Sequence, residues 1–218
     1  DQLANSITLC TPTRHPLKMR ARAVDAEFRS DPRIKYVPYL FKNRMWEPDS
    51  DSKDADGTDA SGRNIYAAMY ELALQHVEQA HSSGAKILTG TDVFDTYVFP
   101  GFSTHDELVE LVGAGLSPAA ALRTATIDAA IFSGVEDTFG SIAVGKTADM
   151  LLLDANPLLD IRNTQQIGGL FFNGQYFDRT ALDRLLEFAE QQAHSVRSNL
   201  HIFWDAVRSP LLRIQFAD

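Results

Sequence analysis

The order of apolar and polar side chains predicts a chain that begins with a short strand. Residues 6–11 alternate and are rich in β-forming side chains, and Pro12 ends the run. A loop that holds Thr13, Arg14 and His15 is expected directly after this strand.

A helix followed by a strand is predicted between residues 64 and 92. Asn64 is a residue type that caps helices, and the positions after it repeat at steps of four, three and four, at Ile65, Met69, Leu72 and His76. Residues 85–88 then have the pattern of a buried strand, which ends in Thr89-Gly90-Thr91-Asp92. A helix followed at once by a strand is half of a βα repeat.

Two further helices are expected before residue 140. Thr104 and Glu107 have the spacing of a capping box, in which two side chains satisfy backbone N–H groups at the start of a helix. Ser117 as N-cap and Pro118 at the first helical position predict another helix, which runs to about Gly134.

From Gly140 onward the chain takes the period of a strand. Strands are predicted over 141–144, 149–153 and 170–177, the last with Asn-Gly as the turn of a hairpin. Residues 180–207 follow with a helical pattern that has one apolar face. A boundary between an α/β part and a small all-β part is therefore expected near residue 140.

Composition limits the possible partners and compartments. Residues 47–62 are dominated by Asp, Ser, Gly and Lys, which predicts a mobile surface loop or lid. The chain has 29 acidic and 20 basic residues and a net charge of −9, which disfavours nucleic acid and anionic membranes as partners. No apolar run approaches the roughly 20 residues that cross a bilayer. The single cysteine, Cys10, excludes an intrachain disulfide and is most compatible with the cytoplasm.

Asp92 is the residue best placed for catalysis. A carboxylate at the C-terminal end of a buried parallel strand projects into the mouth where α/β enzymes place catalytic groups. Asp92 could instead only cap the turn after Gly90. His15 and His105 lie in predicted loops beside strand or helix ends, and both are candidates for contact with a ligand or a metal. The glycine motifs of dinucleotide, nucleoside triphosphate and serine-hydrolase sites are absent from the sequence.

A series of short motifs follows in order from residue 87. Ile87-Leu88-Thr89-Gly90-Thr91-Asp92 precedes Pro100-Gly101-Phe102-Ser103-Thr104-His105-Asp106-Glu107-Leu108, then Gly115-Leu116-Ser117-Pro118-Ala119 and residues 121–126. Gly140-Ser141-Ile142, residues 145–149, residues 154–158 and Asn173-Gly174 complete the series. In this combination the chain resembles the amidohydrolase superfamily, in its imidazolonepropionase and prolidase-like branch, densely over residues 85–178 and loosely over 1–84.

The resemblance implies a metal-dependent hydrolase built as a (β/α)₈ TIM-type barrel with a small β-sandwich. Residues 1–139 would form the last part of the barrel, 140–178 the sandwich strands and 179–218 a helical tail. Asp92 matches the carboxylate after the last barrel strand, which binds the metal and takes a proton from the attacking water. The implied cofactor is zinc or another divalent metal. His105 matches a histidine just beyond that carboxylate, and His105 and His15 are the candidate substrate-binding residues.

The other metal ligands of the family, including the His-x-His of its first strand, match nothing in this chain. We therefore expect self-association, or pairing with an N-terminal portion that supplies them. The leading hypothesis is the C-terminal part of a metal-dependent amidohydrolase that acts on C–N bonds of a small-molecule amide or cyclic amide. The alternative is a non-catalytic fragment or assembly module in which Asp92 is idle.

Overall fold

The computed structural model describes residues 14–22, 25–59, 61–93 and 95–208. The helices and helical turns of the first half are α1 (Arg14–Ala21), α2 (Ala26–Arg29), η1 (Pro32–Tyr36), α3 (Tyr39–Phe41), η2 (Lys42–Trp46), α4 (Glu47–Asp56) and α5 (Ile65–Ser82). The second half contains α6 (Phe102–Gly113), α7 (Pro118–Thr124), α8 (Ile127–Ser133), β1 (Met150–Leu153), η3 (Ile161–Gln165), β2 (Ile167–Phe172), β3 (Gln175–Asp178), α9 (Arg179–His194) and α10 (Val196–Arg208).

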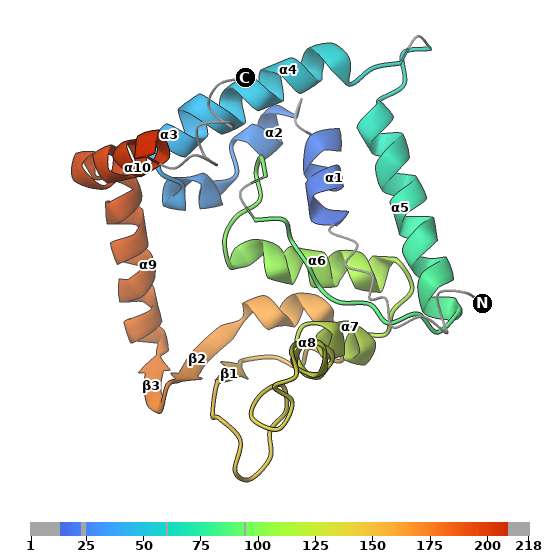
Figure 1. Cartoon of the computed structure of the whole chain (residues 1–218), viewed down its shortest axis with the longest axis vertical. Coiled ribbons are helices and arrows are strands. Elements are labelled where there is room, and N and C mark those ends of the chain that lie inside the picture. Colours follow the sequence, from blue (N-terminus) through green and yellow to red (C-terminus); the bar gives the residue numbers. More distant parts are fainter. Residues whose placement is uncertain (1–13, 23–24, 60, 94, 209–218) are drawn as a thin grey trace.

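Helix α6 lies in the middle of the molecule, between two apolar cores (Figure 1). The first, which we call the helix core, contains Val77, Ala80, Ile87, Leu108, Leu111, Ala114, Leu116, Ala121 and Ile161. The second, the aromatic core, contains Met19, Phe28, Val37, Trp46, Tyr97, Val98 and Phe99. Phe102, at the start of α6, packs against the aromatic core, so the two cores meet at this helix.

The predicted capping box of α6 is wrong. The helix begins at Phe102, and its N-cap is Gly101, which has a φ of 79° and no capping side chain. Because glycine adopts this left-handed backbone at little cost, the chain turns into the helix before it reaches Thr104. Glu107 is fully buried inside the helix.

The start of α5 is confirmed, but the positions whose spacing predicted the helix do not face the core. The Asn64 side chain accepts a hydrogen bond of 3.0 Å from the Ala67 N–H, as an N-cap should. Ile65, Met69 and Leu72 are exposed. The inward stripe has the same period one position later, at Tyr66, Tyr70, Ala73, Val77 and Ala80. The two sets of positions have the same spacing, so spacing alone does not tell which of them faces inward. The small Ala73 and Ala80 permit a closer approach of the neighbouring helices.

The predicted strand over 85–88 does not form as a regular strand among the described residues. Ile87 and Leu88 are nevertheless buried in an extended segment. A parallel strand needs a neighbour for its backbone hydrogen bonds, and the predicted strand 6–11 lies outside the described residues, as do Cys10 and Thr13. The loop expected at Arg14 and His15 is wrong, because α1 begins at Arg14.

The predicted lid over residues 47–62 is also wrong in its first ten residues, which form α4. Glu47 and Asp49 lie in the first turn of α4, where carboxylates favour a helix N-terminus. Trp46 and Ser50, four residues apart, are both buried, so one side of this polar segment is fixed against the aromatic core.

The helix predicted from Ser117 to Gly134 is two helices. Ser117 caps α7 as expected, since its hydroxyl accepts a hydrogen bond of 3.1 Å from the Ala120 N–H. The helix then breaks at Thr126, which has φ −128° and ψ −101°, and α8 continues to Gly134. The predicted helical tail is likewise divided, into α9 and α10, with extended backbone at Ser195.

The hairpin is confirmed. Strands β2 and β3 are antiparallel and pair Phe172 with Gln175 around a turn in which Asn173 and Gly174 both have positive φ. Strand β1 adds to β2, which gives the order β1-β2-β3, whereas residues 141–144 form no strand. No helix in the described part of the chain is long and apolar enough to cross a membrane.

Candidate functional site

Asp92 lies in a turn that directly follows the buried residues Ile87 and Leu88. Its φ is 51°, and its side chain is exposed. Its carbonyl oxygen accepts a hydrogen bond of 3.1 Å from the Asp95 N–H, which closes the turn. The side chain makes no hydrogen bond or ion pair with another described residue, so the carboxylate is presented to solvent.

The loop that carries Asp92 is held from two sides. Arg20 on α1 pairs with Asp95 at 2.7 Å. The Thr96 hydroxyl donates a hydrogen bond to Asp49 on α4. These contacts join residues far apart in sequence, and both restrain the chain directly after Asp92, at Asp95 and Thr96.

Tyr97 anchors the end of the same loop. It is fully buried, and its ring lies 5.3 Å from that of Phe28 and 5.4 Å from that of Trp46. Its φ of 59° is unusual for a bulky side chain and costs on the order of 1–3 kcal/mol, which the surrounding aromatic packing must offset. Burial raises the pKa of the Tyr97 hydroxyl, and the nearby Glu47 acts in the same direction.

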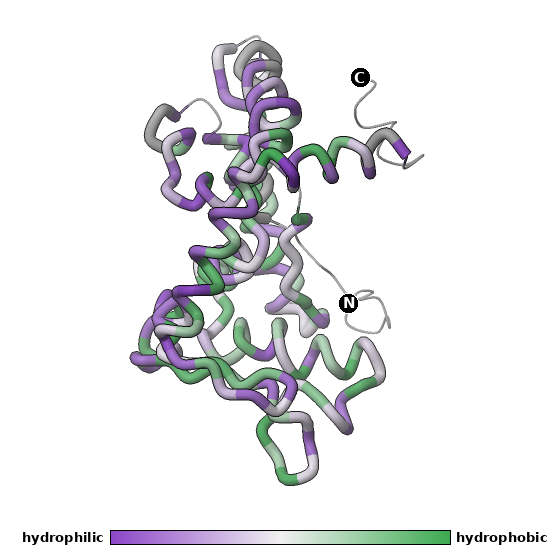
Figure 2. The backbone as a smooth tube through the Cα atoms, turned by 90° about the vertical axis from the view of Figure 1, so that its left-hand side faces the viewer, coloured by the Kyte–Doolittle hydropathy of each residue, from purple (hydrophilic) through white to green (hydrophobic). Residues whose placement is uncertain are grey.

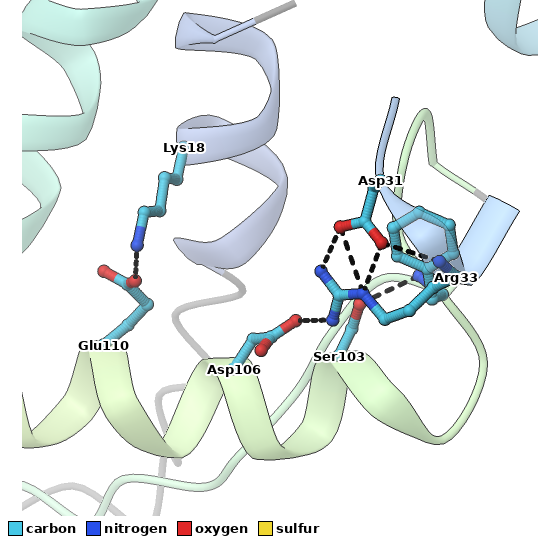
Figure 3. Close-up of polar contacts among 7 residues, drawn as sticks. Lys18, Asp31, Arg33, Ser103, Asp106 and Glu110 are labelled. Atoms are coloured by element: carbon cyan, nitrogen blue, oxygen red, sulfur yellow. Dashed lines mark hydrogen bonds and ion pairs between the residues drawn. The ribbon is translucent and has the colours of Figure 1, made fainter. Parts of the chain in front are cut away.

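A charged cleft of about 500 Å³ lies beside α6 (Figure 3). Arg33 pairs there with Asp106 on α6 at 2.5 Å and with Asp31 at 2.8 Å. Lys18 on α1 pairs with the buried Glu110 at 2.5 Å. Burial alone would lower the pKa of Arg33, but its hydrogen bonds with Asp31 and Asp106 hold that pKa above its ordinary value.

The first turn of α6 connects this cleft to the Asp92 loop. The Phe99 N–H donates to the Ser103 hydroxyl at 2.8 Å, and the Arg33 guanidinium lies 4.6 Å from the centre of the Phe99 ring. The cations of the cleft already have carboxylate partners. We therefore interpret the charged cleft as the support of the Asp92 loop rather than as a ligand site.

His105 is half-buried on α6 and contacts η3. Its Nδ1 lies 3.0 Å from the hydroxyl of Thr164, which itself donates to the Ile161 carbonyl. Because the Thr164 hydroxyl uses its own hydrogen for Ile161, it accepts a hydrogen bond from the Nδ1–H of His105. In the neutral ring the lone pair is then on Nε2. Burial lowers the pKa of His105, and the charge of Asp106 opposes this effect. His15 lies in the first turn of α1, and no described contact brings Asp92 and His105 together.

Among the residues that the structure describes, no three His, Cys, Asp or Glu side chains converge in a way that could hold a metal ion. Asp92 alone does not make a metal site, because zinc and similar ions need at least three protein ligands. The described residues therefore do not by themselves fit the metal that the sequence resemblance implies.

The sequence interpretation missed the supports of the loop. Arg20 and Asp95 are 75 residues apart, and Arg33 and Asp106 are 73 residues apart. No periodicity or capping pattern indicates such pairs. The only available indication was that Asp106 lies within one of the motifs quoted above.

Comparison with known proteins gives one family and several related folds. The model of the amidohydrolase family matches residues 66–176, just over half of the chain. A protein from Bifidobacterium longum assigned as a prolidase is 35% identical, with a TM-score of 0.50 over 63% of this chain and 35% of its own. No curated protein sequence matches.

Two other structures share the fold at lower identity. Bottromycin amidohydrolase is 24% identical, with a TM-score of 0.65 over 87% of this chain and 41% of its own. A Xaa-Pro dipeptidase with bound methionine is 22% identical, with a TM-score of 0.55 over 78% of this chain and 34% of its own. The chain thus spans well under half the length of these relatives, whose superfamily fold is a TIM barrel. Because the family model covers the Asp92 segment, α6 and the hairpin, the chain belongs to the amidohydrolase family.

Proposed function

We propose that this chain is the carboxylate-bearing part of a hydrolase that cleaves C–N bonds in small amides or cyclic amides. In this reaction the oxygen of water bonds to the carbonyl carbon and the C–N bond breaks. The proton that leaves the water passes to Asp92 and then to the departing nitrogen. The main support is the Asp92 turn, which presents an exposed carboxylate, unpaired among the described residues, at the end of a buried segment on a loop held by Arg20 and Asp49.

The proposal needs chain beyond the described residues. The family generally uses a divalent metal, and zinc is the cofactor we expect for the complete site. Its remaining ligands would come from other residues of the same protein or of a second chain. His105 and His15 stay candidates for substrate contact.

The three-stranded sheet offers a surface on which the rest of the protein, or a second chain, could pair. Leu151, Leu152, Phe172 and Tyr176 are exposed on it. Within the described residues β1 is an edge strand, and exposed apolar edges favour pairing with further strands. We therefore also propose the division into a barrel part (1–139), sandwich strands (140–178) and a helical tail (179–218), with the sheet as the point of pairing.

A complementation assay tests this proposal. The full chain would be co-expressed with the N-terminal part of the Bifidobacterium longum protein that this chain leaves unmatched, in medium supplemented with zinc. We expect the purified pair to bind zinc and to hydrolyse Xaa-Pro dipeptides. Asp92→Asn should lower kcat at least about 100-fold, since general acid–base groups contribute 10²–10⁴-fold.

The matched control is Asp137→Asn, which removes another exposed carboxylate in a turn and should leave the rate unchanged. Activity that survives Asp92→Asn would contradict the assigned role of Asp92. A stable pair that binds no zinc and hydrolyses nothing would favour the alternative hypothesis, a non-catalytic assembly module.

A further inference from the structure

Helix α10 has two distinct faces, and one of them is bound to the rest of the chain. The Asn199 amide donates to the carbonyls of Ala193 and Ser195, each at 2.9 Å, and its oxygen accepts from the Leu40 N–H at 3.0 Å. These bonds fix the orientation of α10 relative to α3 and α9. The opposite face must therefore point away from the body.

That outward face is apolar. Val196, Leu200, Phe203 and Trp204 are 75%, 53%, 46% and 53% exposed. Figure 2 shows α10 extending away from the rest of the molecule, so no described element covers this face. Four large exposed side chains on one short helix indicate an interaction surface rather than scattered surface residues.

The spacing of the face is that of a helix-pairing seam. Val196, Leu200 and Phe203 are separated by steps of four and three, which is the pattern of a and d positions in a coiled coil. A hollow of about 410 Å³ lies along the seam, lined by Val196, Arg197, Leu200, His201 and Trp204. In a coiled coil, such a hollow receives one side chain of the facing helix.

The seam complements itself when two copies run antiparallel. In this arrangement Leu200 lies opposite the partner's Phe203. The partner's Phe203 then faces the hollow around Leu200. Arg197, beside the seam, comes near the partner's Trp204, and a guanidinium over an indole is a favourable cation–π contact. Each of these contacts occurs twice by symmetry.

We propose that α10 pairs antiparallel with α10 of a second copy of this chain, with Phe203 of each copy in the hollow beside Leu200 of the other. The net charge of −9 argues against an anionic membrane as the occupant of this face. The proposal is independent of the hydrolase activity, because it uses no residue of the Asp92 loop.

Sedimentation velocity of the full chain tests the pairing, at concentrations from about 1 to about 100 µM. We expect a concentration-dependent dimer, and Leu200→Asp should weaken it at least about tenfold because a buried charge is costly. The matched control is Leu185→Asp on α9, which changes an equally exposed leucine outside the seam and should leave the dimer unchanged. Circular dichroism of both variants checks that the helices persist.

Cysteine cross-linking tests the antiparallel register in a Cys10→Ser background. Chains with Leu200→Cys and with Phe203→Cys, mixed and oxidised, should form mainly the mixed disulfide. A monomer at every concentration, a dimer insensitive to Leu200→Asp, or a preference for Leu200→Cys pairing with itself would overturn the proposal. Binding to phosphatidylserine vesicles without dimer formation would also overturn it, in favour of a membrane.

Discussion

At the residue scale, a lysine contributes most to the free energy of unfolding when the carboxylate that it pairs with is buried. Glu110 is buried, and Lys18 and the Tyr70 hydroxyl are its partners. Lys18→Ala leaves the buried Glu110 carboxylate without its cation. We expect a loss of about 3 kcal/mol in the free energy of unfolding, measured by urea denaturation.

Lys35→Ala is the control, because Lys35 also pairs with a glutamate, Glu190, at 2.9 Å but with both side chains well exposed. Solvent screens such a pair, so this variant should lose less than about 1 kcal/mol. Equal losses in the two variants would show that Glu110 is solvated, and would remove the charged cleft as a support of the Asp92 loop.

At the scale of elements, the sequence predicts helix caps at Ser117 and Thr104, and the structure contains only one of them. The Ser117 hydroxyl caps α7, whereas the predicted cap Thr104 lies inside α6. Ser117→Ala should therefore cost about 1 kcal/mol of unfolding free energy, and Thr104→Ala less than about 0.5 kcal/mol. Thermal and urea unfolding of the two variants measure this difference, and a larger loss for Thr104→Ala would restore the capping box.

The elements predicted correctly are those whose cause is local. Asn64, Ser117 and the Asn173-Gly174 turn act on backbone groups within a few residues, so their sequence is sufficient. The segment 85–88 was predicted as a strand, but a strand depends on a neighbour that its own sequence does not contain. The position of Asp92 after a buried segment was predictable for the same local reason. Its supports, Arg20 and Asp49, were not, because they come from helices distant in sequence.

At the scale of the whole molecule, α6 connects two cores that would otherwise be separate. Leu108 and Leu111 belong to the helix core, while Asp106 holds the aromatic core through Arg33. The two cores should consequently unfold together. Trp46 reports on the aromatic core, since it is buried there and the chain's other tryptophan is the exposed Trp204.

In a Trp204→Phe background, we expect urea transitions followed by Trp46 fluorescence and by far-ultraviolet circular dichroism to coincide, as two-state unfolding requires. Arg33→Met leaves Asp31 and Asp106 without their shared cation and should lower the Trp46 midpoint by about 1 M, since roughly 2–3 kcal/mol is lost at a slope of about 2 kcal/mol per M. The circular dichroism transition should move less.

The control is Arg63→Met, which removes an exposed pair with Asp59 and should leave both transitions together. If the two probes already disagree before Arg33 is changed, the ion pairs along α6 do not couple the cores, and the Asp92 loop is held by its aromatic anchor and by the contacts of Arg20 and Asp49.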